Sequence, residues 1–232
     1  MRGILRMSFK YIVFFIFTII MCYFIYENTT PIEKDPSKLN LKGIDNLMIV
    51  AHPDDETIWG GAHLLEDNYL VVCITCGPNK TRVEELKKAL NISNDKYLML
   101  GYPDKTNGKK DNWDTSKEGI TKDLTKIITY KNWKNIVTHN EDGEYGHIHH
   151  KLSHKIVKSI YEKEKIQGKL YFFGKYYKKT DIDLYKDTLT PISESSKNIK
   201  VNQMIDVYKS QSFITSMFGH MFPYENWQEY NI

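Results

Sequence analysis

Short apolar runs alternate with amphipathic segments along most of this chain. Residues 47–50 form an uninterrupted apolar run. A second run, residues 69–76, follows a helical pattern over 57–66 and is apolar except for Thr75. Uninterrupted runs of this length are typical of strands buried on both faces, whereas apolar positions spaced three and four apart are typical of amphipathic helices. The pattern therefore opens with a strand near 44–51, then a helix and a second strand.

The same alternation continues toward the C-terminus. It predicts helices and strands in turn over 81–90, 97–100, 116–130, 135–138, 149–164 and 169–173. Polar residues over 104–115 indicate a loop, and the chain beyond 178 is less regular, with a helical pattern over 201–209. Strands that alternate with helices predict an α/β fold in which helices cover both faces of a mostly parallel sheet.

The N-terminus departs from this alternation. Residues 11–26 carry no charge, and three basic residues precede them: Arg2, Arg6 and Lys10. An uncharged apolar run of this length lies near the lower limit for a helix that crosses a bilayer. A cleaved signal peptide is the alternative, but it requires small residues near its end, and the residues over 21–26 are mostly large. The run therefore predicts a signal anchor.

This interpretation divides the chain into three parts: a signal anchor or transmembrane segment over 1–26, a polar tether over 27–43 and a globular domain over 44–232. Basic residues before the anchor favour an N-terminus on the cytosolic side, with the domain on the far side. The expected protein is a single-pass membrane protein of the endoplasmic reticulum or the cell membrane, in contact with the membrane through its N-terminal helix.

Composition narrows the classes of function. With 41% hydrophobic and 26% charged residues, the chain has the balance of an ordinary globular domain. The formal net charge of +3 is small, and lysines are interleaved with carboxylates, which is typical of a solvated surface. The sequence contains neither a Walker loop nor a G-x-G-x-x-G run. We therefore expect no nucleic-acid partner, and the α/β pattern lacks a nucleotide signature.

Candidate chemistry begins where the first predicted strand ends. The residues that follow it are His52, Pro53, Asp54, Asp55 and Glu56. In α/β sheets, ligand sites lie beyond the carboxyl ends of the strands. Histidine and carboxylate side chains suit zinc, and a second carboxylate is left to act as a base. Adjacent residues at a strand end point in different directions, so the two aspartates cannot perform the same task.

A second cluster follows the strand predicted over 135–138. Four of the eight histidines lie there, at positions 147, 149, 150 and 154. His147 and His150 share one face of a first helical turn, and His150 and His154 form a competing pair. Lys151 follows His150, so the pair lacks the glutamate of H-E-x-x-H and a zincin is excluded. Surface histidines and a solvated acidic turn are the alternative to a metal site.

These residues resemble the zinc-dependent N-deacetylases of the LmbE/PIG-L family. The resemblance rests on the runs 52–56 and 146–150, and it extends over roughly residues 45–212. Further segments stand in the order of the family: Arg82 with Glu85, Gly101-Tyr102-Pro103-Asp104, Val137-Thr138-His139 and Tyr208-Lys209-Ser210-Gln211. The resemblance implies a Rossmann-like three-layer sandwich, which would follow the one N-terminal transmembrane helix expected from the apolar run over 11–26.

The resemblance also implies a metal centre with one Zn²⁺ per chain. His52 and Asp55 match its first two ligands, and His150 matches the third. Asp54 matches the general base that takes a proton from the attacking water. This division of tasks agrees with the different directions expected for the two aspartates.

Further roles follow from the same resemblance. His147 matches a protonated histidine that stabilises the oxyanion or protonates the leaving amine, and Tyr145 matches a tyrosine that polarises the amide oxygen. Arg82 and Asp104 match positions near the substrate. His149 departs from the Asp or Asn that is common before the last histidine, which affects a contact behind the metal.

The expected activity is hydrolysis of the N-acetyl group of an N-acetylglucosamine-containing glycolipid or glycoconjugate, with release of acetate and a free amine. GlcNAc-phosphatidylinositol suits a membrane anchor, but its deacetylase works on the cytosolic face, opposite to the side that the charges indicate. A glycan or cell-surface polysaccharide is the alternative substrate. A catalytically silent, membrane-tethered sugar- or lipid-binding homologue is the alternative function, and a metal-dependent phosphoesterase is a third.

Overall fold

The computed structural model describes residues 9–28 and 33–231. Its centre is a six-stranded sheet in the order β3-β2-β1-β6-β7-β8. The strands are β1 (Asn46–Val50), β2 (Tyr69–Thr75), β3 (Lys96–Tyr102), β6 (Asn135–Thr138), β7 (Lys169–Phe172) and β8 (Gln228–Glu229). The first five in chain order pair in parallel, and β8 pairs antiparallel with β7 at one edge. The predicted α/β fold with a mostly parallel sheet is confirmed.

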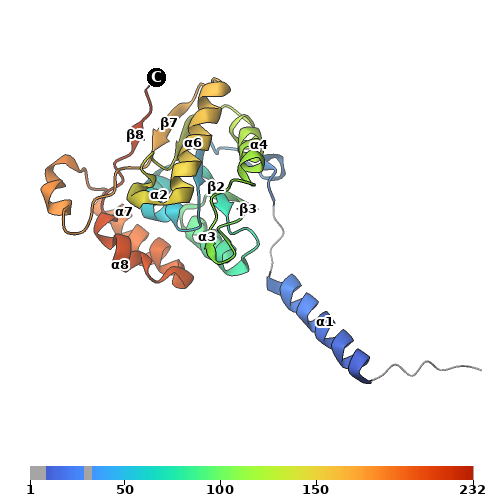
Figure 1. Ribbon diagram of the computed structural model, residues 1–232. Helices are drawn as coiled ribbons and strands as arrows, with labels where there is room; N and C mark the ends of the chain where they lie inside the picture. Colours follow the sequence, from blue (N-terminus) through green and yellow to red (C-terminus); the bar gives the residue numbers. More distant parts are fainter. Residues whose placement is uncertain (1–8, 29–32, 232) are drawn as a thin grey trace, which may run out of the picture.

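Helices cover both faces of this sheet (Figure 1). One face carries α2 and α3 together with the C-terminal helices, and the other carries α4 and α6, which contact each other. The bounds are α2 (Asp55–Glu66), α3 (Lys80–Ser93), α4 (Lys117–Ile128), α6 (Ile148–Lys163), α7 (Glu194–Ile199) and α8 (Ile214–Phe218). A layer of helices, the sheet and a second layer of helices thus form the three-layer arrangement that the sequence pattern predicts.

The core is divided between the two faces because successive strand residues point to opposite sides. In β1, Met48 and Val50 contribute to one cluster, whereas Leu47 and Ile49 contribute to the other, and all four are fully buried. Each buried side chain of this size stabilises the fold by about 1.5–3 kcal/mol. The apolar run over 47–50 is uninterrupted because helices cover both faces of this strand.

The structure departs from the predicted elements in two places. The predicted loop over 104–115 contains a short hairpin, β4 (Lys105–Thr106) with β5 (Lys109–Lys110). The helical pattern over 201–209 forms a π-helical turn, Lys200–Met204, followed by a 3-10 turn, Ile205–Val207. The π-helical turn begins at Lys200, which is fully buried and paired with Glu225. Local periodicity does not predict such a contact.

The N-terminal prediction is not borne out. Helix α1 spans Phe9–Asn28, while positions 1–8 of the predicted anchor and 29–32 of the predicted tether lie outside the described residues. Within the part of the chain that the structure describes, none of the helices combines the length and the apolarity that crossing a bilayer requires. This finding overturns the predicted transmembrane segment and the single-pass localisation, and it gives no support to the predicted membrane contact.

Candidate active site

The two chemical segments of the sequence meet at one edge of the sheet. Strands β1 and β6 are parallel neighbours, with Ile49 opposite Thr138. The run that begins at His52 follows β1, and the segment that begins at His139 follows β6. Because the carboxyl ends of parallel strands face the same way, these two segments converge above the sheet. Helix α6 starts beside them, with His147 as its N-cap residue.

The backbone is strained at Asp54, the residue before α2. Its φ of 125° and ψ of −33° lie outside the regions that L-residues favour. Such conformations cost of the order of 1–3 kcal/mol and persist where the surroundings fix them. Here the Asp54 N–H donates to the Glu56 carboxylate at 2.9 Å, and the hydroxyls of Thr57 and Tyr208 donate to the same carboxylate. The buried Glu56 therefore holds the turn that aims Asp54.

Asp55 joins the two predicted histidine ligands. Its Oδ2 lies 3.2 Å from His52 Nδ1, and its Oδ1 lies 3.2 Å from His150 Nε2. The ring centroids of the two histidines are 5.5 Å apart. Asp55 also accepts a hydrogen bond from the His52 N–H at 2.8 Å, which fixes the carboxylate. The three residues predicted to hold a metal thus lie close together, although two come from the run 52–56 and the third from the run 146–150.

Glu144 orients two histidines behind this centre. One of its oxygens contacts Nδ1 of His150 and, at 3.0 Å, Nδ1 of His139. Since a carboxylate oxygen only accepts, each ring donates a proton from Nδ1. The Ala51 N–H then donates to His139 Nε2 at 3.0 Å. In His150, the same arrangement turns the second ring nitrogen, Nε2, toward Asp55.

That geometry fits a bound cation. His150 Nε2 is buried and has no hydrogen-bond partner among the described residues, although Asp55 lies 3.2 Å away. Two electron-pair donors at this distance require a proton or a metal ion between them. A ligating histidine whose other nitrogen donates to a carboxylate is typical of metal sites. Among the described residues, the groups of three whose ligand atoms lie within 4.8 Å of one another are His52 with His147 and His150, His52 with Asp104 and His149, and Asp55 with His139 and His150. Each of the three predicted ligands belongs to at least one of these groups, but the three do not form a group by themselves.

The charges of the site point the same way. Burial works against a charged His150, but the carboxylates of Asp55 and Glu144 outweigh it and raise the pKa of His150 to about 9. Burial likewise opposes charge on His52, while Asp104 and Asp55 raise the pKa of His52 to about 9. Negative side chains thus favour a positive charge between these rings. A divalent cation bound there would replace the protons.

His149 and Asp104 support His52 from its other side. His52 Nε2 lies 3.0 Å from His149 Nδ1 and 3.3 Å from Asp104 Oδ1. His149 donates from Nε2 to the Asp111 carbonyl at 2.6 Å, and its ring stacks on Trp113 at 4.5 Å. The family departure at His149 is therefore accommodated, because the imidazole is fixed on both sides and contacts the predicted ligand directly.

Asp54 differs from its neighbour in both contacts and charge. Arg82 approaches Asp54 Oδ2 at 3.5 Å and donates to the Pro53 carbonyl. Burial and the negative charge of Asp55 raise the pKa of Asp54 to about 8, although Arg82 opposes the shift. A carboxylate whose pKa lies near neutrality is suited to accept a proton from water. Asp55, in contrast, has a pKa held well below its usual range by His150, despite burial.

His147 is neutral in these surroundings. Burial lowers its pKa to about 2, together with the positive charges of His150 and His52. The His149 N–H contacts His147 Nδ1 at 3.3 Å, so the ring proton lies on Nε2, which can donate a hydrogen bond. This differs from the protonated histidine that the family resemblance implies. Burial also raises the pKa of Tyr145, whose hydroxyl therefore stays a donor.

A cavity of about 340 Å³ opens onto this chemistry. Seven of the eight predicted site residues line it, and His150 lies behind Asp55: the lining set is His52, Asp54, Asp55, Arg82, Asp104, Tyr145 and His147. Lys105 and Lys110 of the β4–β5 hairpin also line this cavity. Phe213, directly before α8, and Met217, within α8, line it as well and are 49% and 45% exposed. The lining of the cavity therefore combines cationic and apolar side chains.

The sequence interpretation left both Glu144 and His139 out of the site, although it quoted His139 as part of the family resemblance. Glu144 is buried and contacts two histidines, and His139 Nε2 lies 3.5 Å from Asp55 Oδ2. His139 stands directly after β6, which is a signal that could have included it. Glu144 lies in a polar loop before the histidines, and its neighbour Glu141 looks equivalent in the sequence but is exposed. Only the fold distinguishes the two glutamates.

Comparison with known proteins shows that part of this sequence matches a described protein family. Residues 47–161 match the family described as PIG-L, GlcNAc-PI de-N-acetylase. A protein of Acanthamoeba polyphaga mimivirus, "Uncharacterized protein L374", is 34% identical over 133 residues, or 50% of this chain and 57% of that protein. The chain thus spans little more than half the length of this relative.

Solved structures share the fold at low sequence identity. The A40926 pseudoaglycone deacetylase Dbv21 has a TM-score of 0.57 at 14% identity, over 75% of this chain and 85% of that one. A deacetylase of teicoplanin biosynthesis has a TM-score of 0.55 at 15% identity, over 73% and 86%. GalB, the 4-carboxy-2-hydroxymuconate hydratase from Pseudomonas putida KT2440, has a TM-score of 0.51 at 14% identity, over 77% and 84%. Since one of the three is a hydratase, these likenesses establish the architecture alone.

Proposed function

The chain belongs to the PIG-L family of metal-dependent N-deacetylases, and we propose that it removes the acetyl group from an N-acetylglucosamine-containing glycolipid or glycoconjugate. The products would be acetate and a free amine. One observation carries the proposal: Asp54, whose pKa is raised to about 8, lines the same cavity as the candidate metal ligands His52 and Asp55. A sugar- or lipid-binding module would have no need of a buried base beside a metal centre.

We propose that His52, Asp55 and His150 hold one Zn²⁺. Two imidazoles and one carboxylate are a donor set that zinc accepts, with a position left for water. When bound, zinc acidifies that water and polarises a carbonyl. The orphaned Nε2 of His150 supports this assignment, because it needs a cation beside Asp55.

The remaining side chains have separate tasks in this proposal. Asp54 takes the proton of the attacking water, and Arg82 keeps its carboxylate aimed at the cavity. His147 donates a hydrogen bond from Nε2, and Tyr145 one from its hydroxyl, to the oxygen of the amide as negative charge develops on it. The proton that Asp54 takes from the water then passes to the departing nitrogen. Asp104 holds His52 and faces the sugar hydroxyls from the rim. Of these side chains, Asp54 is the one that must first lose a proton at neutral pH, because its pKa is raised to about 8.

The residues that line the cavity favour a substrate that carries both an anionic group and an apolar chain. Lys105, Lys110 and Arg82 would attract an anionic group, whereas Phe213 and Met217 offer an apolar surface. A phosphate-linked glycolipid such as GlcNAc-phosphatidylinositol combines both features. A neutral polysaccharide would use neither the lysines nor the exposed apolar side chains.

The test is amine release from a panel of N-acetylglucosamine conjugates. The panel varies the group on the anomeric oxygen: methyl, alkyl, phosphoalkyl and inositol phospholipid. We expect release that a chelator abolishes and that Zn²⁺ restores, with the highest kcat/KM for conjugates that carry both phosphate and alkyl chain. Absence of amine release from every conjugate, with zinc bound, would refute the deacetylase assignment to this substrate class.

A further inference from the structure

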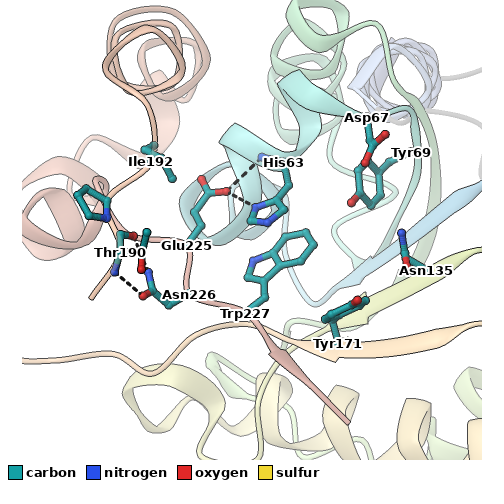
Figure 2. Close-up of a pocket in the computed structure, with 11 residues that line it drawn as sticks. His63, Asp67, Tyr69, Asn135, Tyr171, Thr190, Ile192, Glu225, Asn226 and Trp227 are labelled. Carbon is teal, nitrogen blue, oxygen red and sulfur yellow. Dashed lines mark hydrogen bonds and ion pairs between the residues drawn. The ribbon is translucent and has the colours of Figure 1, made fainter. Parts of the chain in front are cut away.

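A second cavity, of about 550 Å³, lies at the other end of the sheet. Tyr69 and Asn135 contribute to it from the first positions of β2 and β6, whereas the candidate active site follows the last positions of β1 and β6. Figure 2 shows His63 and Trp227 in its middle, with residues from different elements at its two ends: Asp67, Tyr69, Asn135 and Tyr171 at one, and Thr190, Ile192 and Asn226 at the other.

Aromatic rings form the walls of this cavity. The indole of Trp227 stacks on His63, with ring centroids 3.6 Å apart and an interplanar angle of 9°. Tyr69 and Tyr171 stand 6.4 Å and 6.5 Å from the same indole, at 86° and 46°. The Trp227 indole N–H donates to the Trp59 carbonyl at 2.8 Å, so the ring is fixed before any ligand arrives. Rings arranged in this way accept the apolar face of a sugar or a cation.

The charge of the cavity excludes anions. Asp67 is exposed at its rim, and the described residues offer its carboxylate no ion pair. Among the described residues that line the cavity, none is a lysine or an arginine. The buried Glu225 beneath it is already paired with Lys200 and with His63 Nδ1, at 2.7 Å from the latter. One uncompensated carboxylate beside aromatic rings favours a cationic ligand.

Unused hydrogen-bonding groups also face this space. Tyr69 is 2% exposed, yet no hydrogen bond to its hydroxyl occurs within the described part of the chain. Asn135 donates from Nδ2 to Asn46 at 2.8 Å, which leaves its side-chain carbonyl available as an acceptor. The Tyr69 oxygen is not one of the fully buried side-chain atoms that lack a partner, so it reaches the cavity, where water or a ligand can bond to it. The cavity therefore offers a donor and an acceptor to a ligand rich in hydroxyls.

We propose that this second cavity binds a saccharide residue that carries a protonated amine. The apolar face of the ring would pack on Trp227 and Tyr171, and the ammonium would lie between the aromatic rings and Asp67. The hydroxyls would use Tyr69 and Asn135. This inference rests on the cavity alone and not on the proposed deacetylation, although that reaction yields sugars of this kind.

The experiment uses two ligands that differ in one group, methyl glucoside and methyl glucosaminide. Neither carries an acetyl group, so binding is measured whether or not the chain is a deacetylase. The indole N–H resonance of Trp227 is assigned as the one missing from Trp227→Phe, and its shift is followed during titration at about pH 6.5, where the amine is protonated. We expect a saturable shift, with methyl glucosaminide bound at least about tenfold more tightly than methyl glucoside.

Two variants separate recognition of the amine from recognition of the ring. Asp67→Asn keeps the shape of the side chain and removes its charge, and we expect it to reduce the preference for the amine to less than about threefold. Glu118→Gln makes the same change on exposed α4, on the opposite face of the sheet, and should leave both affinities unchanged. No saturable shift with either sugar, or equal affinities for the two in the parent protein, would overturn the proposal.

Discussion

The two cavities of this protein lie at opposite ends of one sheet and differ in the way their polar groups are stabilised. At the carboxyl end, Asp55 and His150 are buried, His52 is partly buried, and their charges favour an added cation. At the amino end, the buried ions Lys200 and Glu225 already satisfy each other, and aromatic rings line the surface above them. The side chains of the first end could share a bound cation, whereas the buried ions of the second already form a pair and only its surface groups stay open to a ligand.

This difference predicts different responses to substitution. Removing a charge at the carboxyl end should change the chemistry or the metal content. Removing one at the amino end should change stability, because Glu225 accepts hydrogen bonds from the Ala62 and His63 N–H groups at 2.9 Å and 3.2 Å and so fixes the middle of α2. The two ends are linked through that helix, whose first turn carries Asp55.

The largest effect is expected at the adjacent aspartates. Asp54→Asn removes the proposed base, so amine release should fall by about 10²–10⁴-fold with the metal still bound. Asp55→Asn removes a candidate ligand and should lower metal content and activity together. Kinetics with an N-acetylglucosaminide, combined with elemental analysis of both variants, measures the two quantities. Loss of metal from both variants to the same extent would contradict the division of tasks.

A large loss of stability is expected at the amino end. Lys200→Met leaves the buried Glu225 carboxylate without its cation, and breaking a buried pair in this way costs about 3–5 kcal/mol. Urea unfolding measures the change in the free energy of unfolding. The double variant Lys200→Met with Glu225→Gln removes both charges and should recover more than half of the loss. A double variant no more stable than the single one would show that packing, not charge, holds this contact.

The pH dependence of stability provides a second test of the buried pair Lys200 and Glu225. Lys200 and His63 hold the pKa of Glu225 down at about 2 despite its burial, against an ordinary value of 4.5. A depressed carboxyl pKa contributes stability that is fully present above the unfolded value and is lost as pH falls toward the folded one. Acid unfolding of Glu225→Gln should therefore depend less steeply on pH between about 4.5 and 2 than that of the parent.

A smaller effect on the metal is expected from Glu144→Gln. The substitution weakens the hydrogen bonds that orient His150 and His139, and losing such a partner typically costs about 10–100-fold in metal affinity. Competition with a chelator measures that affinity. Glu141→Gln is the matched control, since Glu141 lies in the same loop but is exposed. Equal metal affinity in the two variants would show that Glu144 does not support the metal ligands.

The smallest effect is expected at the apolar rim. Phe213→Ser should raise KM about fivefold for conjugates with an alkyl chain, since about 1 kcal/mol of apolar contact is lost, and should leave short conjugates unaffected. Leu184→Ser removes an apolar side chain that is 81% exposed and does not line this cavity, so it serves as the control. A KM that rises equally for short and long conjugates would indicate damage to the site itself.

Much of this architecture could be predicted because its signals are local. The uninterrupted apolar run before His52 predicts a strand buried on both faces, and β1 is such a strand. The spacing of His147 and His150 at the start of a helix likewise reflects one turn of α6. The apolar run over 11–26 was misread as a membrane span, since length and apolarity judged on the sequence alone lie near the limit for such a helix.

The sequence by itself determined the order of strands and helices along the chain, and the kinds of side chain that stand at the strand ends. Only the tertiary structure decided that Glu144 fixes His150, that Arg82 contacts Asp54, and that Glu225 reaches α2 across 163 positions of the chain. The reason is physical. Periodicity records which face of a single element is buried, whereas a contact between distant segments depends on how whole elements pack and leaves no local pattern in either of them.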